Sequence, residues 1–179
     1  MLFVMNELEE MWTNALLEAE LKAAKNKSGD IGDYVRLRET NDAAREIGIA
    51  WLFETFQTVA AEANRRGLNI SLEKTAAHHF AVGAATMRGA LVRLRLGVRS
   101  LTIEAGFPRT PRDGFVRGNG LACARVTHFG FPKANEDLLL VRADPKHAPA
   151  WFALGENNLR QPFQIANLKR HFATFLNTL

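Results

Sequence analysis

Arginine is the residue type in this chain with the clearest chemical potential. Eight arginines and no lysine lie between Arg88 and Arg125, where the only acids are Glu104 and Asp113. This stretch therefore carries a net charge of +6 in a chain whose total is +4. A planar guanidinium group binds phosphate and carboxylate through two parallel hydrogen bonds. The stretch predicts either recognition of an anionic partner or pairing with acids elsewhere in the chain.

Two of these arginines share one face of a predicted strand. Apolar residues alternate with Arg93 and Arg95 along 91–97, so both guanidinium groups are expected to leave the same side of the strand. They are candidates for anion binding. The alternative is a solvated sheet face on which they pair across strands with Glu73 or Glu104.

Three more arginines lie in a segment rich in glycine and proline, 107–120. Long connections inside a domain are often functional, and glycine-rich backbone can turn its N–H groups toward an anion. Arg109, Arg112 and Arg117 are therefore candidate ligand-binding residues. The alternative is a pair of consecutive turns, at 111–114 and at Asn119-Gly120, around a short strand.

The histidines and the cysteine offer weaker candidates. His78 and His79 are adjacent, so on a strand they point to opposite sides and cannot chelate one metal together. Pairing of His79 or His128 with Glu104 would give an acid–base pair or a partial metal site; the alternative is partly buried structural histidines. Cys123 lies among small apolar residues, which is typical of inert packing, whereas a nucleophile would need a lowered pKa.

Common catalytic and cofactor motifs are missing from the sequence. It contains no GxxxxGK[ST] or GxGxxG phosphate-binding loop, no HExxH or CxxC metal motif and no GxSxG nucleophile elbow. We therefore expect no cofactor and no metal site, and an enzymatic function is not favoured.

Helical spacing of apolar residues begins near the N-terminus. Asn6 and Glu9 form a capping-box pattern that predicts the start of a first helix, and Gly29 predicts its end. The next segment, 29–39, is expected to be a connection with a short extended piece at 35–37.

Two further helices are predicted. The cap-forming residues at 40–42 begin a helix that runs from about Asp42 to Arg66, where Gly67 stops it. Apolar residues at helical spacing from Leu168 to Leu179 predict a third helix that closes the chain.

After Gly67 the hydrophobic period changes from 3.6 to 2, which predicts strands. A phase slip near 97–99 indicates a tight hairpin or a bulge there. Short strands joined by turns favour antiparallel pairing, so the predicted fold class is α+β: two N-terminal helices, a mostly antiparallel sheet of about six or seven strands, and a C-terminal helix. The predicted strands are 70–74, 79–87, 91–97, 100–105, 121–129, 137–142 and 150–154.

Length and composition predict one α+β domain over residues 1–179, with a helical part (1–67), a sheet part (68–160) and a closing helix (165–179). A lone cysteine suits a reducing compartment, and the apolar opening 1–5 is too short for a signal peptide, so a cytoplasmic location is expected. No apolar run approaches the ~20 residues of a membrane span. A homodimer is expected because two-fold dimers are the commonest soluble assembly.

Three functional interpretations follow from the sequence. The first is a non-enzymatic binding or assembly domain whose arginine-rich face meets an acidic protein surface or a second copy of the chain. The second is a binder of a phosphorylated small molecule or a nucleic acid, the latter less supported because the patch lacks lysine. The third is an enzyme with a pocket between the sheet and the long helix, using His79, His128 or Glu104.

Overall fold

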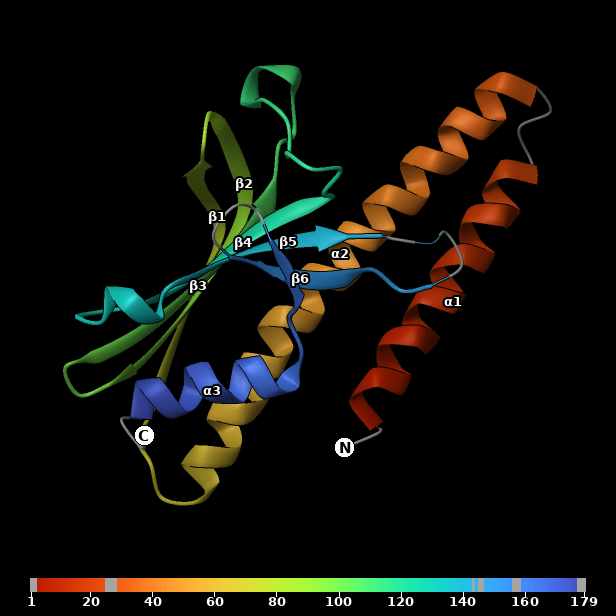
Figure 1. The fold of residues 1–179 in the computed structure, drawn as a ribbon. Helices are drawn as coiled ribbons and strands as arrows, with labels where there is room; N and C mark the ends of the chain where they lie inside the picture. The colour runs from red at the N-terminus through yellow and green to blue at the C-terminus, as the bar shows by residue number, and fades with distance from the viewer. Residues whose placement is uncertain (1–2, 25–28, 143, 145–146, 156–158, 177–179) are drawn as a thin grey trace.

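The computed structural model describes residues 3–24, 29–142, 144, 147–155 and 159–176 as three helices and seven strands (Figure 1). The predicted α+β class, with two helices before the sheet and one after it, is confirmed. The helices are α1 (Phe3–Ala24), α2 (Gly29–Arg65) and α3 (Ile165–Leu176). The strands are β1 (Ser71–Val82), β2 (Ala85–Leu96), β3 (Arg99–Phe107), β4 (Ala122–His128), β5 (Glu136–Val141), β6 (Ala150–Leu154) and β7 (Arg160–Pro162).

The seven strands form one antiparallel sheet in which each strand pairs with the next along the chain. Leu96 pairs with Arg99, so the predicted phase slip is a tight hairpin, and Gly97 takes the positive φ of 59° that the turn requires. One predicted strand, 79–87, is wrong because it runs through the β1–β2 turn at Gly83 and Ala84. Gly83 alone was too weak a turn signal for the sequence to predict two strands within 79–87.

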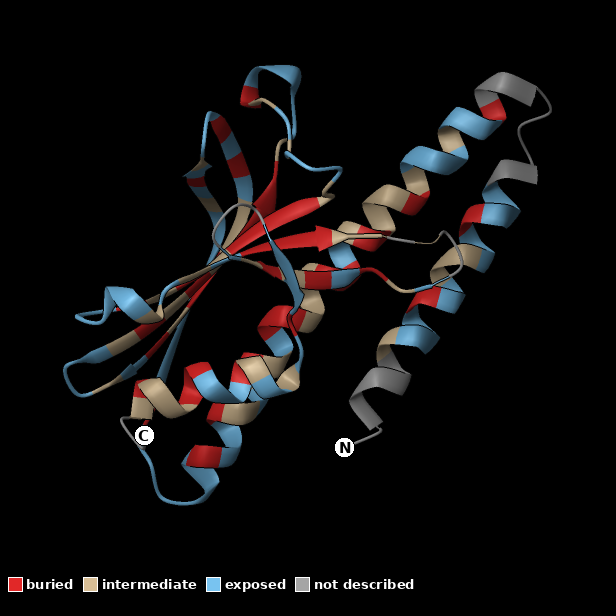
Figure 2. Cartoon of the chain, viewed as in Figure 1, coloured by how far each residue is buried: buried red, intermediate tan, exposed pale blue. Residues whose placement is uncertain are grey.

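The main hydrophobic core lies between one face of the sheet and helices α2 and α3. Leu52 and Phe56 of α2 and Phe172 of α3 pack there against strand residues such as Leu94 and Ile103, all of them buried. Figure 2 shows these buried residues concentrated where the two helices cross the sheet. Helix α1 lies along α2 on the side away from the sheet (Figure 1).

Helix α2 is longer than predicted, because the expected connection at 29–39 is helical. Thr40, interpreted as part of a cap, lies inside the helix and satisfies its hydroxyl on the carbonyls of Arg36 and Leu37 at 2.9 and 3.0 Å. Its 37 residues give a length of about 55 Å at 1.5 Å per residue. The predicted end is confirmed, with Gly67 at a φ of 96° just beyond Arg65.

The predicted start of the first helix is also wrong, since α1 is already formed at Phe3, ahead of Asn6. Helix α1 ends at Ala24, and residues 25–28 lie outside the described residues. Gly29, which was predicted to end this helix, is the first residue of α2. None of the helices in the described ranges combines the length and the hydropathy needed to cross a membrane.

The other face of the sheet carries a second, smaller core. Phe80 and Met87 of the β1–β2 hairpin are buried with Cys123 and Leu139 of β4 and β5. Arg125 of β4 also donates to the carbonyl of Ala81 on β1 at 3.3 Å. The end of the β1–β2 hairpin therefore folds over this face of the sheet.

Two glycines allow this bend. Gly89 and Gly106 are direct cross-strand partners on β2 and β3. A Cβ atom at Gly89 would overlap the carbonyl oxygen of Ala105, and one at Gly106 would lie 2.7 Å from the carbonyl oxygen of Arg88. Only glycine permits the two backbones to approach so closely.

Candidate functional site: an arginine-lined cavity

A cavity of about 380 Å³ lies between the N-terminal half of α2 and the end of β3. Arg38 and Arg45 reach it from the helix, and Arg109 reaches it from the segment that follows β3. Arg38 and Arg45 are seven residues apart, so two turns of helix place them on one face of α2. The fold thus brings together guanidinium groups from segments more than sixty residues apart in the chain. The residues that line the cavity are Tyr34, Leu37, Arg38, Asn41, Asp42, Arg45, Phe107, Pro108 and Arg109.

Contacts fix one of the three guanidinium groups firmly. Arg45 forms a 2.6 Å ion pair with Asp42 and donates from Nε to the carbonyl of Leu121 at 3.0 Å. Its Cζ atom also lies 4.7 Å from the centre of the Phe107 ring. Because these contacts come from the helix, from β3 and from the segment before β4, Arg45 is pre-positioned rather than free.

The other two arginines are more open. Arg109 is exposed and places its Cζ atom 3.9 Å from the centre of the same Phe107 ring, a cation–π contact that leaves its N–H groups available. Arg38 is exposed, and its Nε atom lies 4.0 Å from Oδ2 of Asp42, which is a long and weak ion pair. Among the described lining residues Asp42 is the only acid, so three cations face one carboxylate and this lining has a net positive charge.

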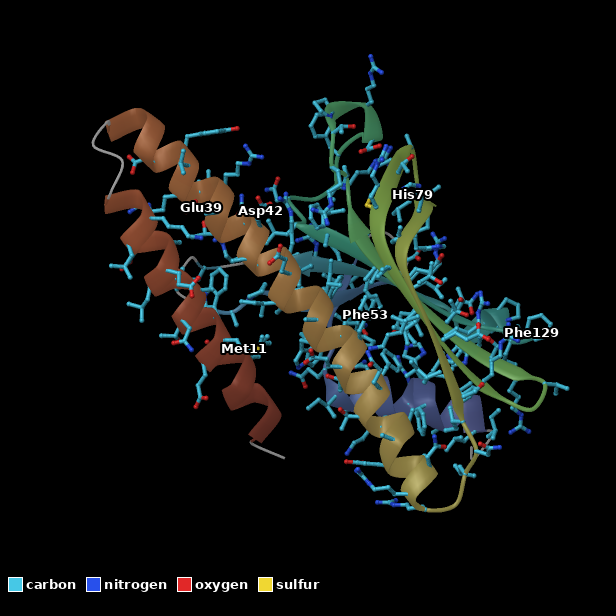
Figure 3. The ribbon with its side chains drawn as sticks, turned by 180° about the vertical axis from the view of Figure 1, so that it is seen from behind. Met11, Glu39, Asp42, Phe53, His79 and Phe129 are labelled. Atoms are coloured by element: carbon cyan, nitrogen blue, oxygen red, sulfur yellow. The ribbon has the colours of Figure 1, made fainter. Side chains whose placement is uncertain are left out.

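Apolar side chains complete the wall of the cavity. Tyr34 is 66% exposed and Leu37 is 53% exposed, although large apolar side chains usually avoid water. Figure 3 shows Glu39 and Asp42 on the stretch of α2 that passes this site. The cavity thus offers cationic groups beside an uncovered aromatic and aliphatic surface.

The structure places Arg93 and Arg95 elsewhere, on the helix-free face of β2. Both pair with Glu73 of β1, at 3.6 and 3.5 Å, and Arg93 also donates to Thr102 at 3.3 Å. Cross-strand pairing with Glu73 was the alternative considered from the sequence. Arg88, which pairs with Phe107, and Arg95 are seven residue steps apart, which is about 23 Å along β2 at about 3.3 Å per step. Arg93 and Arg95 therefore do not meet the arginine-lined cavity.

The β3–β4 segment separates its arginines as well. Arg109 lines the cavity, whereas Arg112 and Arg117 are exposed and are not among the residues that line it. Both predicted turns are present: Pro111–Asp113 forms a short 3₁₀ helix, and Asn119 takes a positive φ of 56°. The stretch 115–117 between them is not a strand.

A buried carboxylate holds this segment in place. Asp113 accepts hydrogen bonds from Thr110, from the backbone N–H of Arg109 and from Arg88 of β2, all between 2.9 and 3.2 Å. The hydrogen bond from Arg88 lowers the pKa of Asp113 to about 2. Asp113 therefore fixes the backbone that carries Arg109 at the cavity.

The predicted pairing of Glu104 with His79 or His128 is wrong, because Glu104 pairs with His78 at 2.5 Å. His78 shares the helix-free face of the sheet with Glu104, while the adjacent His79 leaves the strand on the opposite side and is exposed (Figure 3). His128 is buried on the helix-covered face, where it contacts His171 of α3.

Cys123 is buried in the second core. Burial raises the pKa of its thiol to about 11, with a further rise from Asp137, so very little thiolate exists at neutral pH. This environment matches the inert packing expected from the sequence.

Sequence reasoning missed Arg38 and Arg45. Arg38 falls in 29–39, which was interpreted as a connection, and its spacing from Arg45 has no meaning until that segment is helical. The signal that would have found them is the i, i+4, i+7 spacing of Arg38, Asp42 and Arg45.

A second, more apolar cavity of about 260 Å³ lies where α1, α2, β6 and the start of α3 meet, lined by residues such as Trp51 and Phe163. Within the described ranges, no group of three or more His, Cys, Asp or Glu side chains is arranged to hold a metal ion. The fold and the first cavity define an α+β protein with an arginine-lined pocket. Comparison of the chain with protein-family models, curated proteins and solved structures finds no match.

Proposed function

We propose that this chain is a non-enzymatic binding domain that holds a small organic anion, bearing a phosphate or a carboxylate, in the arginine-lined cavity. The observation that carries the proposal is the meeting of Arg38, Arg45 and Arg109 around a space in which Asp42 is the one acid among the described lining residues. Guanidinium forks match the geometry of both anionic groups.

The size and the walls of the cavity favour a small molecule over a flat protein surface. Its volume of about 380 Å³ is in the range of small-ligand sites. Arg45 is held by Asp42 and Leu121 before any ligand arrives, which lowers the entropic cost of binding. Tyr34 and Leu37 would cover an apolar part of the ligand. Phenyl phosphate, which combines a dianion with a ring, is therefore a suitable probe.

Isothermal titration calorimetry with phenyl phosphate tests the proposal, with phenol as the uncharged comparison. A charge-assisted hydrogen bond contributes roughly 1.5–3 kcal/mol, and solvent exposure reduces this to about 1 kcal/mol for an open side chain. Arg109→Gln and Arg38→Gln should each weaken binding about fivefold, and the double variant should weaken it about 25-fold. Phenol should bind much more weakly than phenyl phosphate.

Arg112→Gln is the matched control, because Arg112 is exposed on the same segment but does not line the cavity. It removes one positive charge without changing the proposed contacts, so binding should stay within twofold of wild type. Equal losses in Arg112→Gln and Arg109→Gln would indicate a diffuse charge effect and contradict the proposed site. Strong heparin binding with a steep salt dependence would instead favour a nucleic-acid partner.

A further inference from the structure

Three apolar side chains lie in water at one end of the sheet. Val98 is 90% exposed in the turn between β2 and β3, and Phe129 and Phe131 are 79% and 54% exposed in the connection from β4 to β5. The two segments are neighbours, because the backbone N–H of Phe129 donates to the carbonyl of Ser100 at 2.9 Å. We call these three side chains the apolar tip. A group of exposed apolar side chains, unlike a single one, indicates an interaction surface.

The apolar tip protrudes from the fold. Figure 1 shows the two turns that carry it, 97–100 and 129–134, projecting side by side from the end of the sheet where α3 lies. Figure 3 shows Phe129 from behind at the same end of the molecule, away from Asp42. The surface is therefore convex, and it suits insertion into a partner rather than enclosure of a ligand.

Cations flank the apolar tip. Arg99 and Lys133, one from each turn, are both exposed, and neither turn contains an acid. The first acid after the second turn, Glu136, is already paired with Arg170 and His171, at 3.2 and 2.8 Å. The surface is therefore apolar at its centre and positively charged beside it.

Arg99 is held in place beside the apolar tip. Its Nη1 atom donates to the carbonyl of Leu176 on α3 at 2.7 Å, so its position does not depend on a ligand. It lines a cavity of about 290 Å³ between the two turns and α3, together with Phe129, Phe175 and His128. A phosphate group that approaches the apolar tip would meet a positioned guanidinium group next to aromatic walls.

The apolar tip is too small for a stable protein partner. Its three side chains expose on the order of 400 Å² together, taking about 150–250 Å² for a whole aromatic side chain. A stable protein–protein interface buries about 800 Å² on each partner. A bilayer surface needs no matching shape, because protruding apolar side chains enter the fluid headgroup region and cations attract anionic lipids.

We propose that this end of the sheet binds the surface of a bilayer that contains anionic lipids. The apolar tip enters the boundary between headgroups and acyl chains, and Arg99 and Lys133 stay at the level of the lipid phosphates. The apolar and the electrostatic contributions act together, because one weak signal alone gives only marginal binding. The arginine-lined cavity lies at the other end of β3, so this surface does not depend on the function proposed for that cavity.

Co-sedimentation of the full chain with vesicles tests this proposal. Wild type should sediment with vesicles made of equal parts phosphatidylcholine and phosphatidylserine, and much less with phosphatidylcholine alone. Phe129→Ser combined with Phe131→Ser should lower partitioning at least about tenfold, the factor expected from partial burial of one aromatic side chain. Lys133→Gln should lower partitioning about fivefold on the anionic vesicles and leave the weaker binding to phosphatidylcholine unchanged.

The opposite end of the molecule supplies matched controls. Phe115 is 79% exposed, as Phe129 is, and Arg112 is exposed, as Lys133 is, but both controls follow β3 at the end opposite Val98. Phe115→Ser and Arg112→Gln should stay within twofold of wild type. Losses equal to those of the matched variants would indicate diffuse attraction and overturn the proposal. Failure of wild type to sediment with the anionic vesicles would overturn it as well.

Two further measurements keep the result decisive. If the double phenylalanine variant fails to fold by circular dichroism, Val98→Asp decides instead: it adds a carboxylate at a 90% exposed position and should weaken binding to the anionic vesicles at least about fivefold. Light scattering tests a second copy of the chain as the occupant. If Phe129→Ser combined with Phe131→Ser halves the mass in solution, the apolar tip is an interface between chains and the proposal is overturned. An unchanged mass with weaker vesicle binding supports the bilayer.

Discussion

The neutral, buried His128 makes the stability of the fold depend on pH in a specific window. Burial and His171 lower the pKa of His128 from 6.5 to about 4 in the folded chain. Below pH 6.5 the unfolded chain therefore binds a proton that the folded chain refuses until about pH 4. Stability rises with pH wherever the unfolded state binds more protons, so it is complete above pH 6.5 and is lost as the pH falls from 6.5 to 4.

The size of this loss follows from the change in proton affinity. A tenfold change in affinity corresponds to about 1.4 kcal/mol, so the full depression is worth about 3 kcal/mol, which solvent at the cavity mouth reduces to about 2 kcal/mol. His128→Gln keeps a neutral polar side chain beside Nδ1 of His171 and removes the titrating group. Between pH 6.5 and 4, the free energy of unfolding should fall about 2 kcal/mol more in wild type than in His128→Gln.

Urea denaturation followed by circular dichroism at several pH values measures this difference directly. Comparison between variants cancels the carboxylates that also titrate in acid, including Glu136. His79→Gln is the control, since an exposed histidine should leave the wild-type pH dependence intact. If His128→Gln and wild type lose stability in parallel from pH 6.5 to 4, His128 is not held neutral by burial.

Three further predictions test the fold around the sites. Asp113→Asn should lower the melting temperature at pH 7, and the wild-type advantage should disappear as the pH falls from about 4 to about 2, because the hydrogen bond from Arg88 lowers the pKa of Asp113 to about 2. Gly89→Ala should not accumulate as folded protein in a soluble expression assay, because its Cβ would overlap the backbone oxygen of Ala105; folded Gly89→Ala protein would contradict the bend. Wild type should have a light-scattering mass of about 40 kDa, twice that of one 19.9 kDa chain, and Leu17→Ser with Leu21→Ser should restore the monomer, because these side chains are exposed on α1. A concentrated wild-type sample that stays monomeric would refute the dimer.

The sequence predicted the order of elements because hydrophobic period is a local property. The change from period 3.6 to period 2 after Gly67 marks the boundary between α2 and the sheet, and the structure places that boundary at the same glycine. The error at 29–39 has a physical cause: Thr40 has the side chain of a cap, but inside a helix its hydroxyl can bond the preceding turn instead. Sequence alone does not distinguish these two uses of threonine.

The sites were less predictable because they depend on contacts between distant residues. Arg93 and Arg109 were both predicted from the sequence to bind an anion. In the structure Arg93 pairs with Glu73, whereas Arg109 lines a cavity with residues of α2. His128 was considered a partner for Glu104, and its true partner, His171, lies 43 residues away within the predicted third helix. Helix packing on the sheet, which no local pattern encodes, decides these pairings.

The arginine-lined cavity and the buried pair of His128 and His171 lie near opposite ends of one strand, which makes their effects separable by experiment. Phe107 ends β3 at the arginine-lined cavity, and Arg99 begins β3 at a cavity of about 290 Å³ that His128 also lines. The eight steps between them span about 26 Å at about 3.3 Å per residue, well beyond the range over which substitutions usually couple. Arg109→Gln should therefore leave the loss of stability between pH 6.5 and 4 unchanged, and His128→Gln should leave phenyl phosphate binding unchanged. Loss of both properties in either variant would mean that the variant disturbs the sheet they share rather than its own site.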